Sequence, residues 1–156
     1  MTTRSPRFDD YAMRLALAAA DAAAASGEAP IGAVVALGRK VVAVAHNLVE
    51  TLPDPTAHAE TLAIRAAARR FGAARLPDCD LFVTLEPCAM CASAIEHARI
   101  RRLVFAAYDA KGGGVEHGAR VFERQTCRHR PDVIGGVMAE PAAERLQAFF
   151  KGLRAG

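Results

Sequence analysis

Two short motifs contain the residue types best suited to chemistry in this sequence. His58 and Glu60 are separated by one alanine. Cys88 and Cys91 lie three positions apart, directly after Pro87. One imidazole and two thiolates suit a tetrahedral zinc ion at distances of about 2.0–2.3 Å. A helix that starts after Pro87 would favour the thiolate forms, because helix N-termini stabilise negative charge. The sequence therefore predicts a zinc site made of His58, Cys88 and Cys91.

Three protein ligands leave the fourth position of a tetrahedral zinc ion free for water, whose pKa falls to about 7 there. Glu60 is two residues beyond His58, so its carboxylate can lie beside the ion without binding it. Such a carboxylate can accept a proton from the water and later deliver protons to the substrate. This predicts a hydrolytic deaminase, in which water attacks an amidine-like carbon and ammonia leaves. The order His-x-Glu then Pro-Cys-x-x-Cys is the pattern described for zinc-dependent nucleobase deaminases.

Two alternatives use the same residues differently. A closed structural zinc site would need a fourth protein ligand and would leave Glu60 without a purpose. The candidates for that ligand are Cys127, His97, His117 and His129. A redox pair of the thioredoxin kind would use Cys88 and Cys91 and would need no His-x-Glu partner.

Length and composition limit the fold. The chain has 156 residues, of which 52% are hydrophobic and 24% charged, so we expect a single deaminase domain over residues 1–156 with a full hydrophobic core. Twelve glycines and eight prolines exclude collagen-like and largely disordered chains. No apolar run reaches the roughly 18 residues of a membrane span, and the polar first ten residues do not form a secretory signal. We therefore expect a soluble protein located in the cytoplasm.

The charge is mildly basic. Twenty Lys and Arg residues against seventeen Asp and Glu residues give a formal net charge of +3. Arginines cluster within 65–75, 99–102 and 120–130. Such clusters are usually solvated faces, but they can also steer an anionic polymer towards the protein.

The hydrophobic pattern predicts an α/β fold, because strands alternate with helices and the sheet must be covered on both faces. The predicted strands cover 31–37, 40–45, 79–85, 101–107 and part of 131–137. The predicted helices cover 8–22, 56–70, 88–98 and a segment from Pro141 onwards. Thr56 is the expected N-cap of the second helix. Residues 109–130 have no clear period, so they form a functional loop or contain a short helix.

Two of these helices have a predicted apolar face. In the first helix it consists of Phe8, Tyr11, Leu15, Ala18 and Ala22. In the last helix it consists of Leu146, Phe149, Phe150 and Leu153.

In its motifs the chain resembles the bacterial tRNA adenosine deaminases, members of the zinc-dependent cytidine and deoxycytidylate deaminase superfamily. The matching blocks are 30–34, Asn47, 54–60, 83–91 and 109–111, and the resemblance runs from about residue 28 to 150. It implies a three-layer α/β/α cytidine-deaminase-like fold with a five-stranded mixed sheet, one Zn²⁺ per subunit and a homodimer. The implied activity is deamination of adenosine to inosine at the wobble position of a tRNA anticodon.

The resemblance also implies roles for single residues. It assigns zinc binding and proton transfer to the residues of the two motifs. Asn47 would hydrogen-bond the flipped nucleoside, and Asp109 would contact the sugar-phosphate beside it, with Lys111 also binding substrate. Phe149 and Phe150 correspond to an aromatic pair near the RNA. An anticodon loop fits this chemistry, because its unpaired bases leave the stack at lower cost than bases in a duplex.

Segment 112–117 departs from the commonest bacterial version, which has a smaller stretch of Ala, Gly and Ser. Its three glycines lack the Lys-Ser/Thr of a phosphate-binding loop, and we expect a mobile segment. A free-base or nucleoside deaminase acting on guanine or cytosine would use the same zinc chemistry. A non-catalytic, zinc-stabilised RNA-binding protein is the alternative outside enzymes. No nucleotide cofactor or membrane partner is expected.

Overall fold

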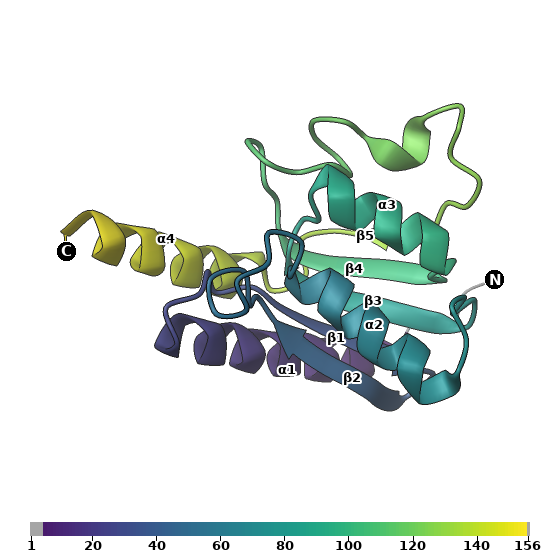
Figure 1. The fold of residues 1–156 in the computed structure, drawn as a ribbon, viewed down its shortest axis with the longest axis horizontal. Coiled ribbons are helices and arrows are strands. Elements are labelled where there is room, and N and C mark those ends of the chain that lie inside the picture. The colour runs from purple at the N-terminus through teal and green to yellow at the C-terminus, as the bar shows by residue number, and fades with distance from the viewer. Residues whose placement is uncertain (1–4, 156) are drawn as a thin grey trace.

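The computed structural model describes residues 5–155, in which a five-stranded sheet lies between two pairs of helices (Figure 1). The helices are α1 (Pro6–Ala25), α2 (Ala59–Phe71), α3 (Ala89–Ala98) and α4 (Ala139–Ala155). The strands are β1 (Gly32–Leu37), β2 (Lys40–His46), β3 (Cys79–Leu85), β4 (Arg102–Ala107) and β5 (Asp132–Ile134). The α/β class with a five-stranded mixed sheet is therefore confirmed. Part of the polar N-terminus discussed above, residues 1–4, lies outside the described range.

The sheet brings the ends of its central strands to one edge. The strand order is β2-β1-β3-β4-β5. β1 pairs antiparallel with β2 and β3, whereas β3, β4 and β5 run parallel. Because β3 and β4 are parallel, Leu85 and Ala107 at their carboxyl ends are neighbours. In open α/β sheets this edge is where ligands bind.

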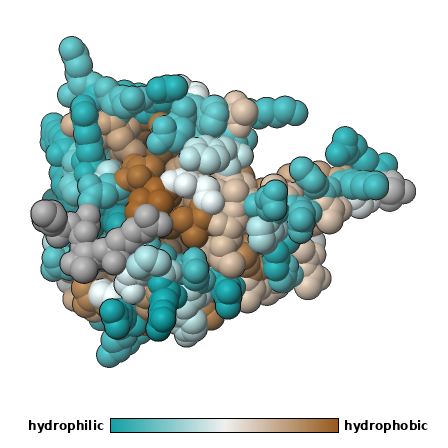
Figure 2. Space-filling model, turned by 180° about the vertical axis from the view of Figure 1, so that it is seen from behind, coloured by the Kyte–Doolittle hydropathy of each residue, from teal (hydrophilic) through white to brown (hydrophobic). Residues whose placement is uncertain are grey.

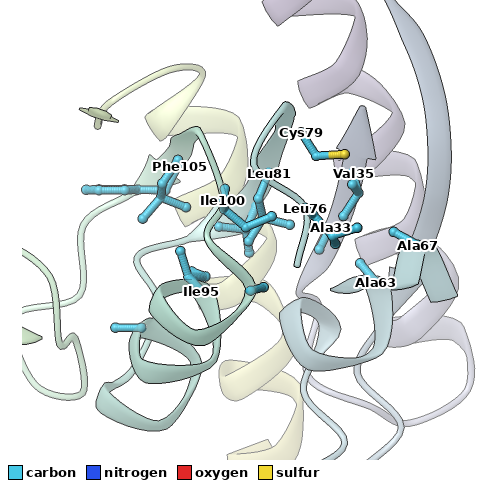
Figure 3. Close-up of a cluster of buried hydrophobic side chains, with 14 of the residues drawn as sticks. Ala33, Val35, Ala63, Ala67, Leu76, Cys79, Leu81, Ile95, Ile100 and Phe105 are labelled. Atoms are coloured by element: carbon cyan, nitrogen blue, oxygen red, sulfur yellow. The ribbon is translucent and has the colours of Figure 1, made fainter. Parts of the chain in front are cut away.

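Each face of the sheet carries its own hydrophobic core. Under α2 and α3, Ala63 and Ile95 pack towards Leu81 of β3 and Phe105 of β4 (Figure 3). On the opposite face, Phe82 lies in the second core with residues of α1 and α4. The alternation of Leu81 and Phe82 between the two faces is the normal consequence of the strand period of two. Helices α2 and α3 are thus fixed on one face, with their N-termini at the edge where β3 ends.

Helix α1 buries a different face from the predicted one. Of the predicted stripe, Tyr11 is 54% exposed and Ala18 and Ala22 are exposed as well, whereas Phe8 and Leu15 are partly buried at the edge of the second core. The buried residues are Asp9, Ala12, Met13, Ala16, Leu17, Ala19, Ala20 and Ala23. The reason is the closeness of α1 to β1: a Cβ atom on Gly32 would lie 2.0 Å from the backbone oxygen of Ala16. Small side chains such as Ala16 and Ala20 therefore line the contact with Gly32, and the larger Met13 and Leu17 fill the second core beside it.

This close contact makes Gly32→Ala destabilising. The added methyl group has only backbone atoms of α1 to displace, so we expect a loss of at least about 1–3 kcal/mol in unfolding free energy, as in other overpacked cores. Urea denaturation measures it. Gly152→Ala is the matched control, because nothing lies within 4 Å of a Cβ atom there. Equal midpoints for Gly32→Ala and the wild type would contradict the close packing.

The end of the chain departs from the sequence-based expectation in its packing. Helix α4 begins two residues before Pro141, and its C-terminal part extends beyond the body of the protein (Figures 1 and 2). Phe150 is 46% exposed and Leu153 is 61% exposed, so the predicted core face is wrong at this end. For residues 109–130 the alternatives are a functional loop or a segment with a short helix, and the structure shows a long loop with one 3₁₀ turn, Val121–Glu123. Among residues 5–155, no helix has the length and apolar character needed to cross a membrane.

Candidate active site

His58 lies at the N-cap position of α2 and is placed there by the neighbouring strand. The carboxamide oxygen of Asn47, just beyond β2, accepts the backbone N–H of Ala59 at 2.9 Å. Asn47 therefore caps the helix with its side chain. The prediction that Thr56 caps α2 is wrong. The backbone N–H and hydroxyl of Thr56 both donate to Asp54 Oδ1, at 2.8 and 2.7 Å, which holds Thr56 in a turn before the helix.

The two cysteines come from the turn between β3 and α3. Cys88 is the N-cap residue of α3, and Cys91 is buried in its first turn. A hydrogen bond from the Cys91 thiol lowers the pKa of Cys88 to about 4, and the His58 imidazole adds to this effect. The pKa of Cys91 is raised, by the same hydrogen bond and by burial. Without a metal ion, the pair therefore carries its negative charge on Cys88.

The three side chains fit a tetrahedral metal ion. His58 Nδ1 lies 3.6 Å from Cys88 Sγ and 3.4 Å from Cys91 Sγ. A tetrahedral zinc ion with bonds of about 2.0 Å to nitrogen and 2.3 Å to sulfur separates these atoms by about 3.5 Å. Within residues 5–155, this is the one group of three or more His, Cys, Asp or Glu residues whose potential ligand atoms all lie within 4.8 Å of one another.

A fourth protein ligand does not join this group in the part of the chain that the structure describes. His117 Nδ1 lies 2.8 Å from Glu86, and His129 Nε2 lies 2.6 Å from the backbone oxygen of Ile100. The Cys127 thiol donates to the backbone oxygen of His129. Cys88 and Cys91 are free thiols, not a disulfide. The arrangement thus matches an open site of three ligands and not a closed site of four, and the position of His58 Nδ1 beside both sulfur atoms favours a metal site over a redox pair.

Glu60 is buried beside the three ligand residues. Glu60 is 4% exposed. It lines the same cavity as His58 and Cys88, and this cavity has a volume of about 230 Å³. Burial raises the pKa of Glu60 to about 7 in the chain without a metal ion. A bound dication would act in the opposite direction and favour the carboxylate. Glu60 is therefore placed to exchange protons with a ligand in this cavity, which we call the central cavity.

The outer side of the central cavity is formed by the loop after β4. Asp109 and Gly112 line it together with His58, Glu60 and Cys88. Asp109 Oδ1 accepts the backbone N–H groups of Lys111 and Gly112, at 3.1 and 2.9 Å, so its carboxylate also shapes this turn. At about 230 Å³ the cavity is smaller than the roughly 300–1,000 Å³ of pockets for drug-sized ligands. That size suits a single base.

Two further hollows flank the central cavity and contain the other predicted substrate-binding residues. Asn47 and Phe149 line one of about 400 Å³, and Lys111 and Asp109 line another of about 440 Å³. Phe150 borders both, because α4 passes between them. The structure therefore gathers Asn47, Asp109, Lys111 and Phe149 around the site, although Asn47 uses its side-chain oxygen to cap α2.

Sequence reasoning missed the role of Glu86. This residue directly follows β3 and is 2% exposed. Burial alone would raise the pKa of Glu86, but hydrogen bonds from the Asp109 backbone N–H and the His117 side chain outweigh it and lower the pKa. A charged residue directly before Pro87 and Cys88 was the available signal.

The lowered pKa of Cys88 predicts selective alkylation of the metal-free protein. Above pH of about 4 the Cys88 thiol is ionised, whereas an ordinary thiol ionises near about 8.5. After zinc is removed with a chelator, iodoacetamide at pH 6 is therefore expected to modify Cys88 before Cys79, whose pKa is raised by burial. Peptide mass spectrometry identifies the labelled thiol. Zinc added beforehand protects Cys88, and equal labelling of both thiols would contradict the assignment.

The fold and this site together define a zinc-dependent deaminase domain. The cytidine and deoxycytidylate deaminase zinc-binding region matches residues 6–107 of the chain, and the protein belongs to this family. The predicted family is therefore confirmed.

Within the family, the chain is similar to tRNA-specific adenosine deaminases. It is 51% identical over 139 residues to the tRNA-specific adenosine deaminase of Agrobacterium fabrum, which covers 89% of this chain and 91% of that protein. A structure solved in a study of A-to-I editing by tRNA:A34 deaminases at the wobble position matches with a TM-score of 0.86 at 51% identity, over 87% of this chain and 99% of that one. A guanine deaminase from Nitrosomonas europaea matches with a TM-score of 0.80 at 22% identity, over 96% and 86% of the two chains, and shows the shared fold.

Proposed function

We propose that this protein is a zinc-dependent hydrolase that converts adenosine to inosine at the wobble position of a tRNA anticodon. The observation that carries the proposal is the placement of buried Glu60 beside an open group of three ligand residues, in a chain 51% identical to a tRNA-specific adenosine deaminase. His58, Cys88 and Cys91 hold one zinc ion per subunit. When bound there, zinc acts as a Lewis acid and lowers the pKa of water.

Glu60 moves the protons of the reaction. Its carboxylate accepts a proton from the water that adds to C6 of adenine. It passes this proton to the ring nitrogen next to C6. It then transfers the second proton, from the hydroxyl group now on C6, to the amino group, so that the C6–N bond breaks, the C6=O bond forms and ammonia leaves as a neutral molecule. Burial of Glu60 keeps bulk water away from this exchange. His58 and Cys88 are the N-cap residues of α2 and α3, so the two helices hold these zinc ligands in fixed positions beside the base.

The substrate is held by the residues that surround the central cavity. Asp109 contacts the sugar-phosphate of the target nucleotide, and Lys111 adds a positive charge beside it. Asn47 contacts the nucleoside, and Phe149 of α4 contacts the neighbouring RNA. These positions are supported by the three adjoining hollows that the residues line. Binding of this kind should weaken as salt concentration rises.

We also propose that residues 1–156 form one deaminase domain and that two copies associate as a homodimer in the cytoplasm. The proposal of a homodimer is supported by the family resemblance, and a tRNA substrate implies the location. Sedimentation equilibrium of the zinc-loaded protein tests the dimer, since a monomer at micromolar concentration would contradict it.

Incubation with defined substrates tests the proposed reaction. The zinc-loaded protein is given an anticodon stem-loop with a wobble adenosine and, separately, guanine and cytidine. We expect inosine in the RNA and no ammonia from the two small molecules. A stem-loop with adenosine moved to a neighbouring loop position is the matched control. Turnover of guanine or cytidine alone would establish a free-base or nucleoside deaminase instead.

A further inference from the structure

Glu86 is a buried carboxylate to which the mechanism above assigns no step. Its side chain has 0% of its surface exposed. It accepts five hydrogen bonds, and all of them come from residues of one segment, which we call loop 109–117. This number is large for one side chain, because an ionised carboxylate offers about four lone-pair sites.

The two oxygens of Glu86 hold the two ends of loop 109–117 together. Oε1 accepts the backbone N–H of Asp109 at 3.1 Å and lies 2.8 Å from Nδ1 of His117. Oε2 accepts the backbone N–H groups of Val115, Glu116 and His117, at 3.2, 2.9 and 3.1 Å. One carboxylate therefore accepts hydrogen bonds from four backbone N–H groups that lie outside helices and strands and would otherwise need water as a partner.

The glycines of the loop permit this arrangement. A Cβ atom on Gly113 would lie 2.4 Å from Glu86 Oε2, and one on Gly114 would lie 2.5 Å from the backbone nitrogen of Ala89. Gly114 also donates its N–H to the backbone oxygen of Pro87 at 2.8 Å. The loop is thus packed against the turn that carries Cys88. The glycines serve close packing, and the expectation of a mobile segment is wrong for Gly113 and Gly114, which are both buried.

The position of the loop decides the shape of the central cavity. Asp109 and Gly112 line this cavity together with His58 and Glu86 itself. Glu86 binds the backbone N–H of Asp109 directly, and Gly112 lies in the sequence between Asp109 and Val115, the next residue whose N–H Glu86 binds. If the ends of the loop separated, the wall formed by these two residues would move away from the site. The ligand residues would stay in place, since His58 and Cys88 are fixed by α2 and α3.

We infer that Glu86 is a positioning residue for the substrate: with His117 it fixes loop 109–117, so that Asp109 and Gly112 form the wall against which the target nucleotide binds. The identity of that nucleotide rests on the proposed function, whereas the link between Glu86 and the loop does not. Glutamine at this position offers one acceptor oxygen, and its NH₂ group would face the N–H donors of the loop.

Glu86→Gln tests the inference in the zinc-loaded protein. We expect KM for the anticodon stem-loop to rise by about tenfold or more, the effect of losing hydrogen bonds to a buried charge, with a smaller change in kcat. Zinc content stays at the wild-type value. Hydrogen exchange of the amides of residues 113–117 becomes faster, while that of α2 and α3 does not change. Glu116→Gln is the matched control, because it makes the same chemical change on an exposed side chain of the same loop.

A second, milder variant tests the inference even if Glu86→Gln does not fold. His117→Ala removes one of the five hydrogen bonds, at a side chain that is 36% exposed, so it should fold and raise KM by a few-fold. An unchanged KM and unchanged exchange in the loop would overturn the inference, as would a loss confined to zinc content or kcat. If the wild type did not convert the stem-loop, the proposed function would fail, and the exchange measurement would still decide the role of Glu86.

Discussion

Glu60→Ala is expected to lower kcat for deamination by about 10²–10⁴-fold, the usual contribution of a general acid-base residue. The variant lacks the buried carboxylate that lines the central cavity beside His58 and Cys88. It should keep its zinc, because Glu60 is not among the three ligand residues. Ammonia release from the stem-loop measures the activity, and metal analysis measures the zinc.

Two companion variants make this result specific. Glu60→Gln preserves the size of the side chain but cannot accept the proton, so it should be as inactive as Glu60→Ala. Glu123→Ala removes an exposed carboxylate that pairs with Arg120 at 3.4 Å, and it should keep full activity. Wild-type turnover in Glu60→Gln would assign the proton transfer to another group.

Removal of a ligand side chain should abolish both zinc binding and activity. Cys91→Ala leaves His58 and Cys88 as the remaining pair, and two ligands hold zinc far more weakly than three. A three-ligand catalytic site holds about one zinc ion per chain in the wild type. In Cys91→Ala we expect the zinc content to fall to near zero and turnover to become undetectable. Metal analysis after dialysis and the stem-loop assay measure the two effects.

The matched control uses a cysteine outside the site. Cys127→Ala removes a half-buried thiol that donates to the His129 backbone oxygen, and it should retain zinc and activity. Wild-type protein treated with a chelator should lose activity and regain it when Zn²⁺ is added. A fully active Cys91→Ala protein would mean that the metal does not lie at this group.

The metal group could be predicted from sequence because its parts are local. His58 and Glu60 are two residues apart, and the Cys88 and Cys91 pair lies in one helical turn, so each half is fixed by a single helix start. The distance between the halves depends on the sheet, and the alternation of helices and strands was sufficient to predict that sheet. The structure brings all three ligand side chains together.

Other features depend on contacts between distant segments. The face of α1 was misassigned because large apolar residues such as Tyr11 outweigh alanine in a hydrophobic pattern, whereas the close approach to Gly32 selects alanine. Thr56 is a residue type that often caps helices, but its backbone N–H is bound by Asp54. The cap comes from Asn47, twelve positions before Ala59. The role of Glu86 likewise requires loop 109–117, which has no periodic pattern that locates it.

The feature on which the proposed chemistry depends most is the fourth position of the metal ion, and X-ray absorption spectroscopy of the zinc-loaded protein tests it directly. We expect one nitrogen at about 2.0 Å, two sulfurs at about 2.3 Å and one oxygen from water. The oxygen should be displaced when a transition-state analogue of adenosine deamination is added. A shell of four protein donors, with a second imidazole or a third sulfur in place of the oxygen, would contradict an open catalytic site and indicate a structural one.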